Sequence, residues 1–200
     1  MQSKELRRVW MPGALITKKA LAHAMRTLMQ EEAFRRISVG DICERCGMSR
    51  KSFYYHFRDK YELVNWIFDQ DFIALVRDRS YDNAWEFFED LCTYFYENRT
   101  FYVNAFAVEG QNSFTEYFAE VLQPIAQDYF MRILGDDRKK EFFAVFFTDA
   151  FRVSLIRWLR EPQNLSPSEY IALLKVCIVG VAKRVVEGTP SEAEGKEKDE

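Results

Sequence analysis

The sequence has few of the residues from which active sites and metal centres are built. It contains only two histidines, His23 and His56, and four cysteines among 200 residues. It has no Gly-x-Gly-x-x-Gly turn, no phosphate-binding loop, no cluster with metal-ligand spacing and no nucleophile paired with a base. We therefore expect no catalytic residue, no metal and no cofactor, which argues against an enzyme.

Long apolar runs are also missing. No window of about 18 or more apolar residues occurs, so no membrane span is expected, and the first residues lack the apolar core of a signal peptide. We expect a cytoplasmic protein whose cysteines, Cys43, Cys46, Cys92 and Cys177, are reduced. The C-x-x-C pair of Cys43 and Cys46 leaves two interpretations open, a redox-sensitive pair or the packed core of a small domain.

Charge is unevenly distributed along the chain. The net charge is −3, but residues 1–60 hold 13 Lys and Arg against 6 Asp and Glu, whereas the other 140 residues hold 15 against 25. The first part is therefore at +7 and the remainder at −10. A hydrophobic fraction of 48% is that of a folded protein. This distribution is typical of a DNA-binding head joined to a body that is not attracted to DNA.

The segment from Ser38 to Lys60, SVGDICERCGMSRKSFYYHFRDK, carries the signals of two short helices and the start of a third. Ser38, Ser49 and Asp59 are residues that favour helix N-caps. Gly47 suits the left-handed conformation that often ends a helix. Two short helices joined by a tight turn containing Gly predict a helix-turn-helix.

The second helix of this motif has an almost entirely polar surface. Phe53 and Phe57 are four residues apart and can face the core together. A helix of this width fits the DNA major groove, where Arg50 or Lys51 could donate to guanine. Further contacts to phosphates or thymine methyl groups are available from Ser52, Tyr54, Tyr55 and His56. The alternative is a helical hairpin whose Tyr and His side chains only cap a small core.

The motif resembles that of a known family. The run Ile42…Gly47-Met48-Ser49…Phe53-Tyr54-Tyr55-His56-Phe57…Lys60…Leu63 is similar to the DNA-binding motif of the TetR family of bacterial regulators, over about residues 15–67. The chain departs from that family at Cys43-Glu44-Arg45-Cys46, where Ala and charged residues are more usual. The resemblance implies that recognition-helix positions touch DNA and that Lys60 and the helix start at Ser38 hold phosphates. The predicted DNA-binding residues are Ser38, Ser49, Arg50, Lys51, Ser52, Tyr54, Tyr55, His56 and Lys60.

Helical periodicity continues through most of the chain and predicts an all-α fold. We expect a flexible arm at 1–14, because Pro12-Gly13 should break a helix, and a three-helix head with the helix-turn-helix at 15–59, whose first helix begins at Thr17. A helical regulatory and dimerisation body should follow at 60–187, and a disordered acidic tail at 188–200. The helices of the body are predicted at 60–79, 84–98, 100–109, 113–134, 138–160 and 167–187. Pro124 should kink or split the helix at 113–134.

The last two predicted helices lack a clear polar face, so both sides of each should be buried. In the TetR family the last two helices of each chain form a four-helix dimer interface, and this resemblance implies a homodimer. The alternative is that these helices are only the core of the body. The predicted interface residues are Phe143, Phe146, Trp158, Leu174, Cys177, Ile178 and Val181.

Aromatic side chains are unusually frequent between Trp85 and Trp158. They could line an apolar cavity with a few hydroxyl groups directed inward, and the TetR family commonly binds a small effector there. The alternative is a dense aromatic core without a ligand. The predicted effector-binding residues are Phe88, Tyr94, Phe95, Tyr102, Phe106, Tyr117, Phe118, Phe147 and Phe151.

These features predict a sequence-specific DNA-binding transcriptional regulator of the TetR type. We expect a repressor that binds a near-palindromic operator in double-stranded DNA as a homodimer and responds to a small apolar or aromatic effector. The alternative is a regulator controlled by a protein partner, acting as an activator or co-regulator. This alternative arises because the body resembles that of Firmicutes-type regulators related to an activator of dihydroxyacetone kinase genes.

Overall fold

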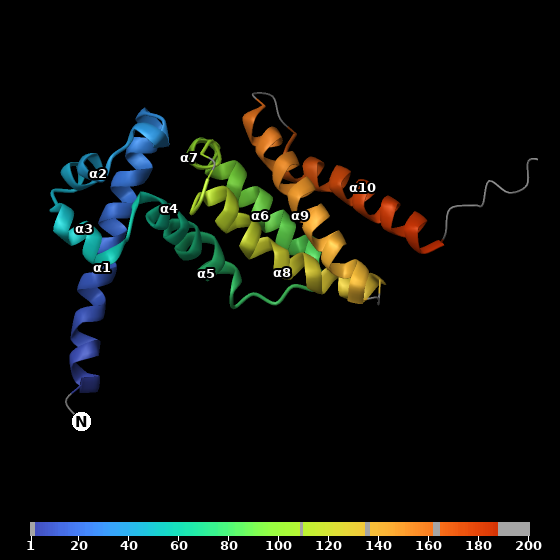
Figure 1. Ribbon diagram of the computed structural model, residues 1–200, viewed down its shortest axis with the longest axis horizontal. Helices are drawn as coiled ribbons and strands as arrows, with labels where there is room; N and C mark the ends of the chain where they lie inside the picture. The colour runs from blue at the N-terminus through green and yellow to red at the C-terminus, as the bar shows by residue number, and fades with distance from the viewer. Residues whose placement is uncertain (1–2, 109, 135–136, 162–164, 188–200) are drawn as a thin grey trace, which may run out of the picture.

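The computed structural model describes the backbone of residues 3–108, 110–134, 137–161 and 165–187, and the side chains of residues 13–108, 110–128, 141–161 and 165–180. All regular structure in these residues is helical (Figure 1), which confirms the all-α prediction. Among them, none of the helices combines the length and apolar character that crossing a membrane requires. The tail predicted at 188–200 lies outside the described residues.

The amino-terminal head has the three predicted helices and the start of a fourth. Its elements are α1 (Ser3–Glu31), a short 3₁₀ helix η1 (Phe34–Arg36), α2 (Val39–Arg45), α3 (Arg50–His56) and α4 (Lys60–Phe68). The predicted N-caps are confirmed: Ser38 and Asp41 form a capping box, Ser49 accepts from the amide of Ser52, and Asp59 accepts from two amides of α4. Gly47 has φ of 66°, the left-handed conformation that ends α2.

The prediction that the first helix begins at Thr17, after a flexible arm, is wrong. α1 is continuous from Ser3 and contains Pro12 and Gly13. The hydroxyl of Thr17 donates to the carbonyl of Gly13 at 3.0 Å, a bond to the preceding turn rather than an N-cap. Proline removes one hydrogen bond from a helix, at a cost of about 3 kcal/mol, but the helix can continue through it.

The fourth helix contains a π-helical segment that the sequence did not reveal. α4 continues into η2 (Asp69–Ile73) and α5 (Ala74–Val76), so the helix predicted to reach residue 79 ends at Val76. In η2 the amide of Ala74 donates to the carbonyl of Asp69, which places one extra residue in the turn. Asp69 accepts from the hydroxyl of Tyr117, and Asp71 pairs with Arg26 of α1. The segment therefore joins the head to the body.

The body contains five helices that follow the predicted ranges closely. They are α6 (Ala84–Glu97), α7 (Arg99–Ala105), α8 (Phe114–Leu134), α9 (Asp137–Arg160) and α10 (Pro167–Glu187). One expectation needs correction, because α7 ends at Ala105 rather than near 109. Of the two outcomes predicted for Pro124, a split of α8 does not occur, and a kink stays a prediction. Figure 1 shows α4 and α5 between the head, formed by α1 to α3, and the body.

The centre of the chain is a cluster of aromatic rings around Phe68, which is fully buried. Its ring lies next to rings from η2, α6, α7 and α8. These neighbours are Phe72, Tyr94, Phe95, Tyr102, Phe114, Tyr117 and Phe118. Because α4 also begins directly after the helix-turn-helix, this cluster fixes the direction in which the head projects.

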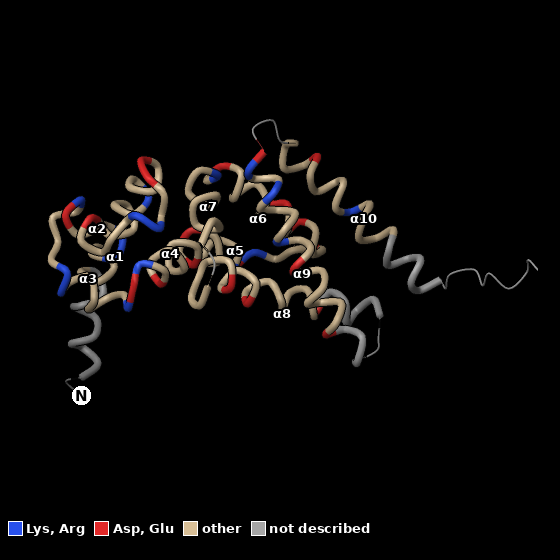
Figure 2. The backbone as a smooth tube through the Cα atoms, turned by 45° about the horizontal axis from the view of Figure 1, so that its top comes forward, with Lys and Arg blue, Asp and Glu red and all other residues tan. Residues whose placement is uncertain are grey.

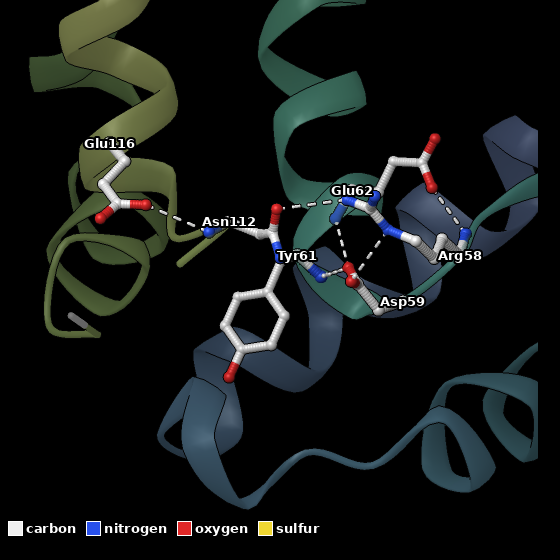
Figure 3. Close-up of polar contacts among 6 residues, drawn as sticks. All are labelled: Arg58, Asp59, Tyr61, Glu62, Asn112 and Glu116. Carbon is white, nitrogen blue, oxygen red and sulfur yellow. Dashed lines mark hydrogen bonds and ion pairs between the residues drawn. The ribbon is translucent and has the colours of Figure 1, made fainter. Parts of the chain in front are cut away.

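Two further polar contacts hold the head against the body. The side-chain amide of Asn104 on α7 donates to the carbonyls of Met29, at 2.7 Å, and Glu32, at 3.3 Å, and so satisfies the end of α1. Figure 3 shows the second contact, where Arg58 donates to the side chain of Asn112 at 3.3 Å. Arg58 follows α3 by two residues, so the turn before α8 is linked to the end of the candidate recognition helix.

Candidate nucleic-acid interface

Helix α3 packs one side on the head and leaves the other open. Phe53 is fully buried and Phe57 nearly so, as their spacing predicts. Between them Tyr54 is 58% exposed and Tyr55 80% exposed, and Arg50 and Lys51 are also exposed. Large aromatic side chains on a solvent-facing helix have no packing reason to be there. They form a continuous polar and aromatic surface that can enter a major groove.

Arg50 lies against α2 as well as on α3. A Cβ added to Gly40 would come within 2.5 Å of a terminal guanidinium nitrogen of Arg50, so Gly40 leaves room for this side chain. The guanidinium therefore lies beside the amino terminus of α2, where Ser38 is the cap. A positive charge beside the amino terminus of a helix suits a phosphate. We expect Arg50 to contact the DNA backbone rather than a base.

His56 closes α3 and lies half-buried against Tyr55. Burial, followed by the nearby charge of Lys18, lowers the pKa of His56 below its usual value. The lower pKa favours the neutral imidazole, which can donate one hydrogen bond and accept another without adding charge. Lys18 itself lies over the rings of Phe57 and Trp66. Lys18 is a basic neighbour of α3 that the sequence motif did not indicate.

The structure favours a structural role for Lys60, and the predicted phosphate contact stays a prediction. Its ammonium group donates to the carbonyls of Ile37 at 2.6 Å, Phe34 at 2.8 Å and Arg35 at 3.4 Å. An ammonium group has three donors, and all three are used. It also lies over the ring of Phe34, 4.5 Å from the centroid, and burial lowers its pKa. Lys60 therefore ties α4 to the chain before α2.

Lys and Arg residues occur on each of the three helices of the head. Figure 2 shows Lys and Arg positions along α1, α2 and α3. Ser38 and Ser49 are exposed and Ser52 is half-buried, and each lies at the start of α2 or α3. The structure thus brings the predicted DNA-binding residues onto one surface, with Lys60 beneath it. Whether they touch DNA stays a prediction.

Most of the predicted effector-binding residues lie in the aromatic core, although Phe106 also borders an open pocket beside Gly110 and Ser113. Tyr94, Phe95, Tyr102, Phe106, Tyr117 and Phe118 pack against one another or against Phe68 and Phe114 in the aromatic core. The hydroxyls of Tyr94 and Tyr102 pair at 2.6 Å, so neither points into open space. For these six residues the alternative of a dense core is the better description.

Phe88, Phe147 and Phe151 do line a cavity. Its volume is about 40 Å³ and it lies between α6, α8, α9 and α10. The other lining residues are small or apolar apart from one threonine: Ala84, Trp85, Leu122, Ala126, Thr148, Leu174 and Ile178. The sequence could not separate this group from the other aromatic residues, because both groups have the same composition.

The predicted dimer residues differ in how far their side chains are exposed. Phe146 and Cys177 are exposed and Phe143 is half-buried. Trp158 is only 4% exposed, stacks on Tyr170 at 4.5 Å and donates to the carbonyl of Leu165, so its prediction as an interface residue is wrong. Leu174 and Ile178 are half-buried at the cavity, and the side chain of Val181 lies outside the described residues.

The two cysteines of the C-x-x-C pair belong to the head. Cys43 is buried and the thiol of Cys46 donates to the carbonyl of Ile42 at 3.2 Å. Burial raises the pKa of both thiols, which lowers the fraction of reactive thiolate. These observations favour the interpretation that the pair packs the head.

Comparisons with known proteins match two parts of the chain to family models. Residues 21–67 match the family described as "Bacterial regulatory proteins, tetR family", and residues 82–180 match the family described as "Transcriptional regulator C-terminal region". Together these matches take in the helix-turn-helix, α4 and most of the body.

Individual proteins similar to this chain are also named as regulators of transcription. The chain is 36% identical over 109 residues to a curated protein of Lactococcus lactis subsp. lactis (strain IL1403), named "HTH-type dhaKLM operon transcriptional activator DhaS"; the match spans 54% of this chain and 57% of that protein. A solved structure named "Dihydroxyacetone kinase operon activator DhaS" is 26% identical, with a TM-score of 0.60 over 86% of this chain and 97% of that one. A TetR regulator from Streptococcus agalactiae 2603V shares the fold, with a TM-score of 0.64 and 19% identity over 84% of this chain and 98% of that one.

Proposed function

Because the chain belongs to the TetR family of bacterial transcriptional regulators, we propose that it binds a near-palindromic DNA site as a homodimer through α3 and the start of α2. The protein acts in the cytoplasm, where the bacterial chromosome lies. The observation that carries the proposal is the exposed surface of α3, where Lys51, Tyr54 and Tyr55 face solvent over the buried anchors Phe53 and Phe57. Such a surface, with basic charge around it, suits a major groove.

Selection from a random pool of DNA duplexes tests this function directly. We expect the protein to enrich one sequence whose two halves are related by a two-fold axis, because two identical heads read identical half-sites. Binding should weaken steeply as salt is raised, since phosphate contacts release counterions. Enrichment of no sequence, or of one without two-fold symmetry, would contradict the proposed mode of binding.

The exposed apolar surface of α9 and α10 supports the dimer. Large exposed apolar side chains on two helices of one chain are candidates for an interface. The exposed side chains that compose this surface are Phe142, Val145, Phe146, Val153, Leu173 and Val176. A second copy of the chain fits this surface because both helices could pack against their own symmetry mates.

Placing a charge in this patch should separate the two copies. We expect Phe146→Asp, at a side chain that is 54% exposed, to yield monomers in sedimentation velocity and to weaken DNA binding at least 10-fold, since each monomer then holds one half-site. The matched control is Leu75→Asp on α5, where a side chain is 60% exposed but lies outside the patch. A dimeric Phe146→Asp protein at micromolar concentration would rule out this interface.

The direction of regulation has a second candidate. The sequence predicted a repressor, but two similar proteins carry the word activator in their names. This similarity supports activation as the alternative. Transcription from a promoter that contains the selected site, measured with and without the protein, distinguishes the two outcomes.

A further inference from the structure

The turn before α8 holds an asparagine in the left-handed conformation. Asn112 has φ of 66°, and among the non-glycine residues that the structure describes it alone has a positive φ. Asparagine tolerates this region because its short polar side chain can hydrogen-bond locally. The amide of Asn112 donates to Glu116 at 3.1 Å, and the amide of Glu116 donates to the hydroxyl of Ser113 at 3.3 Å. The turn is thus fixed on the first turn of α8, in an arrangement similar to a capping box.

The side chain of Asn112 is directed at the head. Figure 3 shows it meeting Arg58, whose guanidinium donates to Oδ1 of Asn112 at 3.3 Å. On the other side, Nε of Arg58 lies 3.5 Å from the carboxylate of Asp59. Asp59 is in turn the N-cap of α4. Arg58 therefore connects the start of α4 to the turn before α8.

The other polar contacts between head and body lie elsewhere. In the part of the chain that the structure describes, the remaining hydrogen bonds between the head and the body come from Asn104 and reach the carboxyl end of α1. The side-chain contacts of η2, to Tyr117 and Arg26, lie beyond the other end of α4. A head attached only at these points can rotate about them, because rigid bodies turn about the few contacts that they keep. Arg58 follows α3 by two residues, so its bond to Asn112 restrains the side of the head that carries α3.

We propose that Arg58 and Asn112 are positioning residues that fix the angle of each head, and thereby the spacing between half-sites that the protein accepts. This inference rests on the proposed function. In a symmetric dimer the two bodies are fixed by their interface, so the angle of the heads sets the separation of the two copies of α3. Successive base pairs are about 3.4 Å apart, so a head that rotates accepts spacers that differ by one or two base pairs. The bases read within each half-site stay the same, because α3 is unaltered.

Selection from a pool of duplexes with the same two half-sites and spacers of varied length tests this specificity. We expect the unchanged protein to prefer one spacer over the next best by about tenfold in affinity, and Asn112→Gly by less than about threefold. Glycine keeps the left-handed conformation and removes the oxygen that accepts from Arg58. Asn112→Asp restores an acceptor and should restore the preference. The matched control is Gln111→Ala, one position earlier and also exposed, which should bind like the unchanged protein.

The angle of the head is also measured without DNA, through residual dipolar couplings of the backbone amides. One alignment should fit the head and the body of the unchanged protein. In Asn112→Gly the couplings of α1, α2 and α3 should shrink while those of α6 and α8 stay. Equal couplings in the two proteins, or the same spacer preference, would overturn the role of Arg58 and Asn112. If the unchanged protein enriches no symmetric site, the proposed function fails, whereas the couplings still decide whether this contact fixes the head.

Discussion

We expect Lys60→Met to lower the free energy of unfolding by about 3 kcal/mol, because a hydrogen bond from a charged group contributes about 1.5–3 kcal/mol and the carbonyls of Phe34 and Ile37 lose the ammonium donor. Methionine keeps most of the length of the side chain, so the loss comes from the ammonium group and not from a cavity. Unfolding by urea, recorded at one fixed protein concentration, measures the change in the free energy of unfolding.

The same variant distinguishes a structural lysine from one that holds phosphate. At a temperature where Lys60→Met is folded, its affinity for the selected DNA should stay within about threefold of the unchanged protein. The slope of affinity against salt should also be unchanged, since no phosphate contact is removed. Lys51→Met is the matched control: this lysine is exposed, so stability should be unaffected while the salt slope falls. Unaltered stability with a lower salt slope in Lys60→Met would restore the phosphate role.

Replacing Lys51 and Tyr55 together by alanine should weaken binding to the selected duplex about 100-fold, because each good contact to a base is worth about 1–3 kcal/mol. Tyr55 is the most exposed aromatic side chain of α3. Its removal therefore leaves no cavity, and the melting temperature should stay within about 2 °C of the unchanged protein. Fluorescence anisotropy with a labelled duplex gives the dissociation constants of the double variant and of the unchanged protein.

The control for this double change is the pair Leu75 on α5 and Arg77 directly after it, which are exposed but distant in sequence from the helix-turn-helix. Their replacement by alanine should leave DNA affinity unchanged. If the α3 variant retains its affinity while folded, this helix does not enter the groove. The proposed function would then need a different DNA-binding surface.

The head could be predicted from the sequence in unusual detail because its signals are local. The N-caps at Ser38, Ser49 and Asp59 depend on residues at most three positions away. Gly47 needs only its own left-handed conformation. The spacing of Phe53 and Phe57 already fixed which side of α3 is buried, and therefore which side is free to meet DNA. The family resemblance rested on these same residues.

The first helix and the aromatic body show where such reasoning fails. Pro12 and Gly13 weaken a helix locally, but they do not determine whether the chain breaks there, and α1 continues through them. Aromatic residues are equally suited to lining a cavity and to filling a packed core. Only the arrangement of four helices determines that Phe88, Phe147 and Phe151 border open space, whereas Phe95 and Phe118 are in contact with each other.

The sequence by itself thus determined the class of the protein: an all-helical chain with a basic helix-turn-helix at one end. It did so because helix caps, turns and periodicity act over a few residues. The tertiary structure alone determined that Lys60 binds the carbonyl of Ile37, 23 positions away, and that Asn104 caps α1, 75 positions from Met29. A long side chain bonds to groups that the fold places beside it, and these groups cannot be predicted from the residues nearby in the sequence.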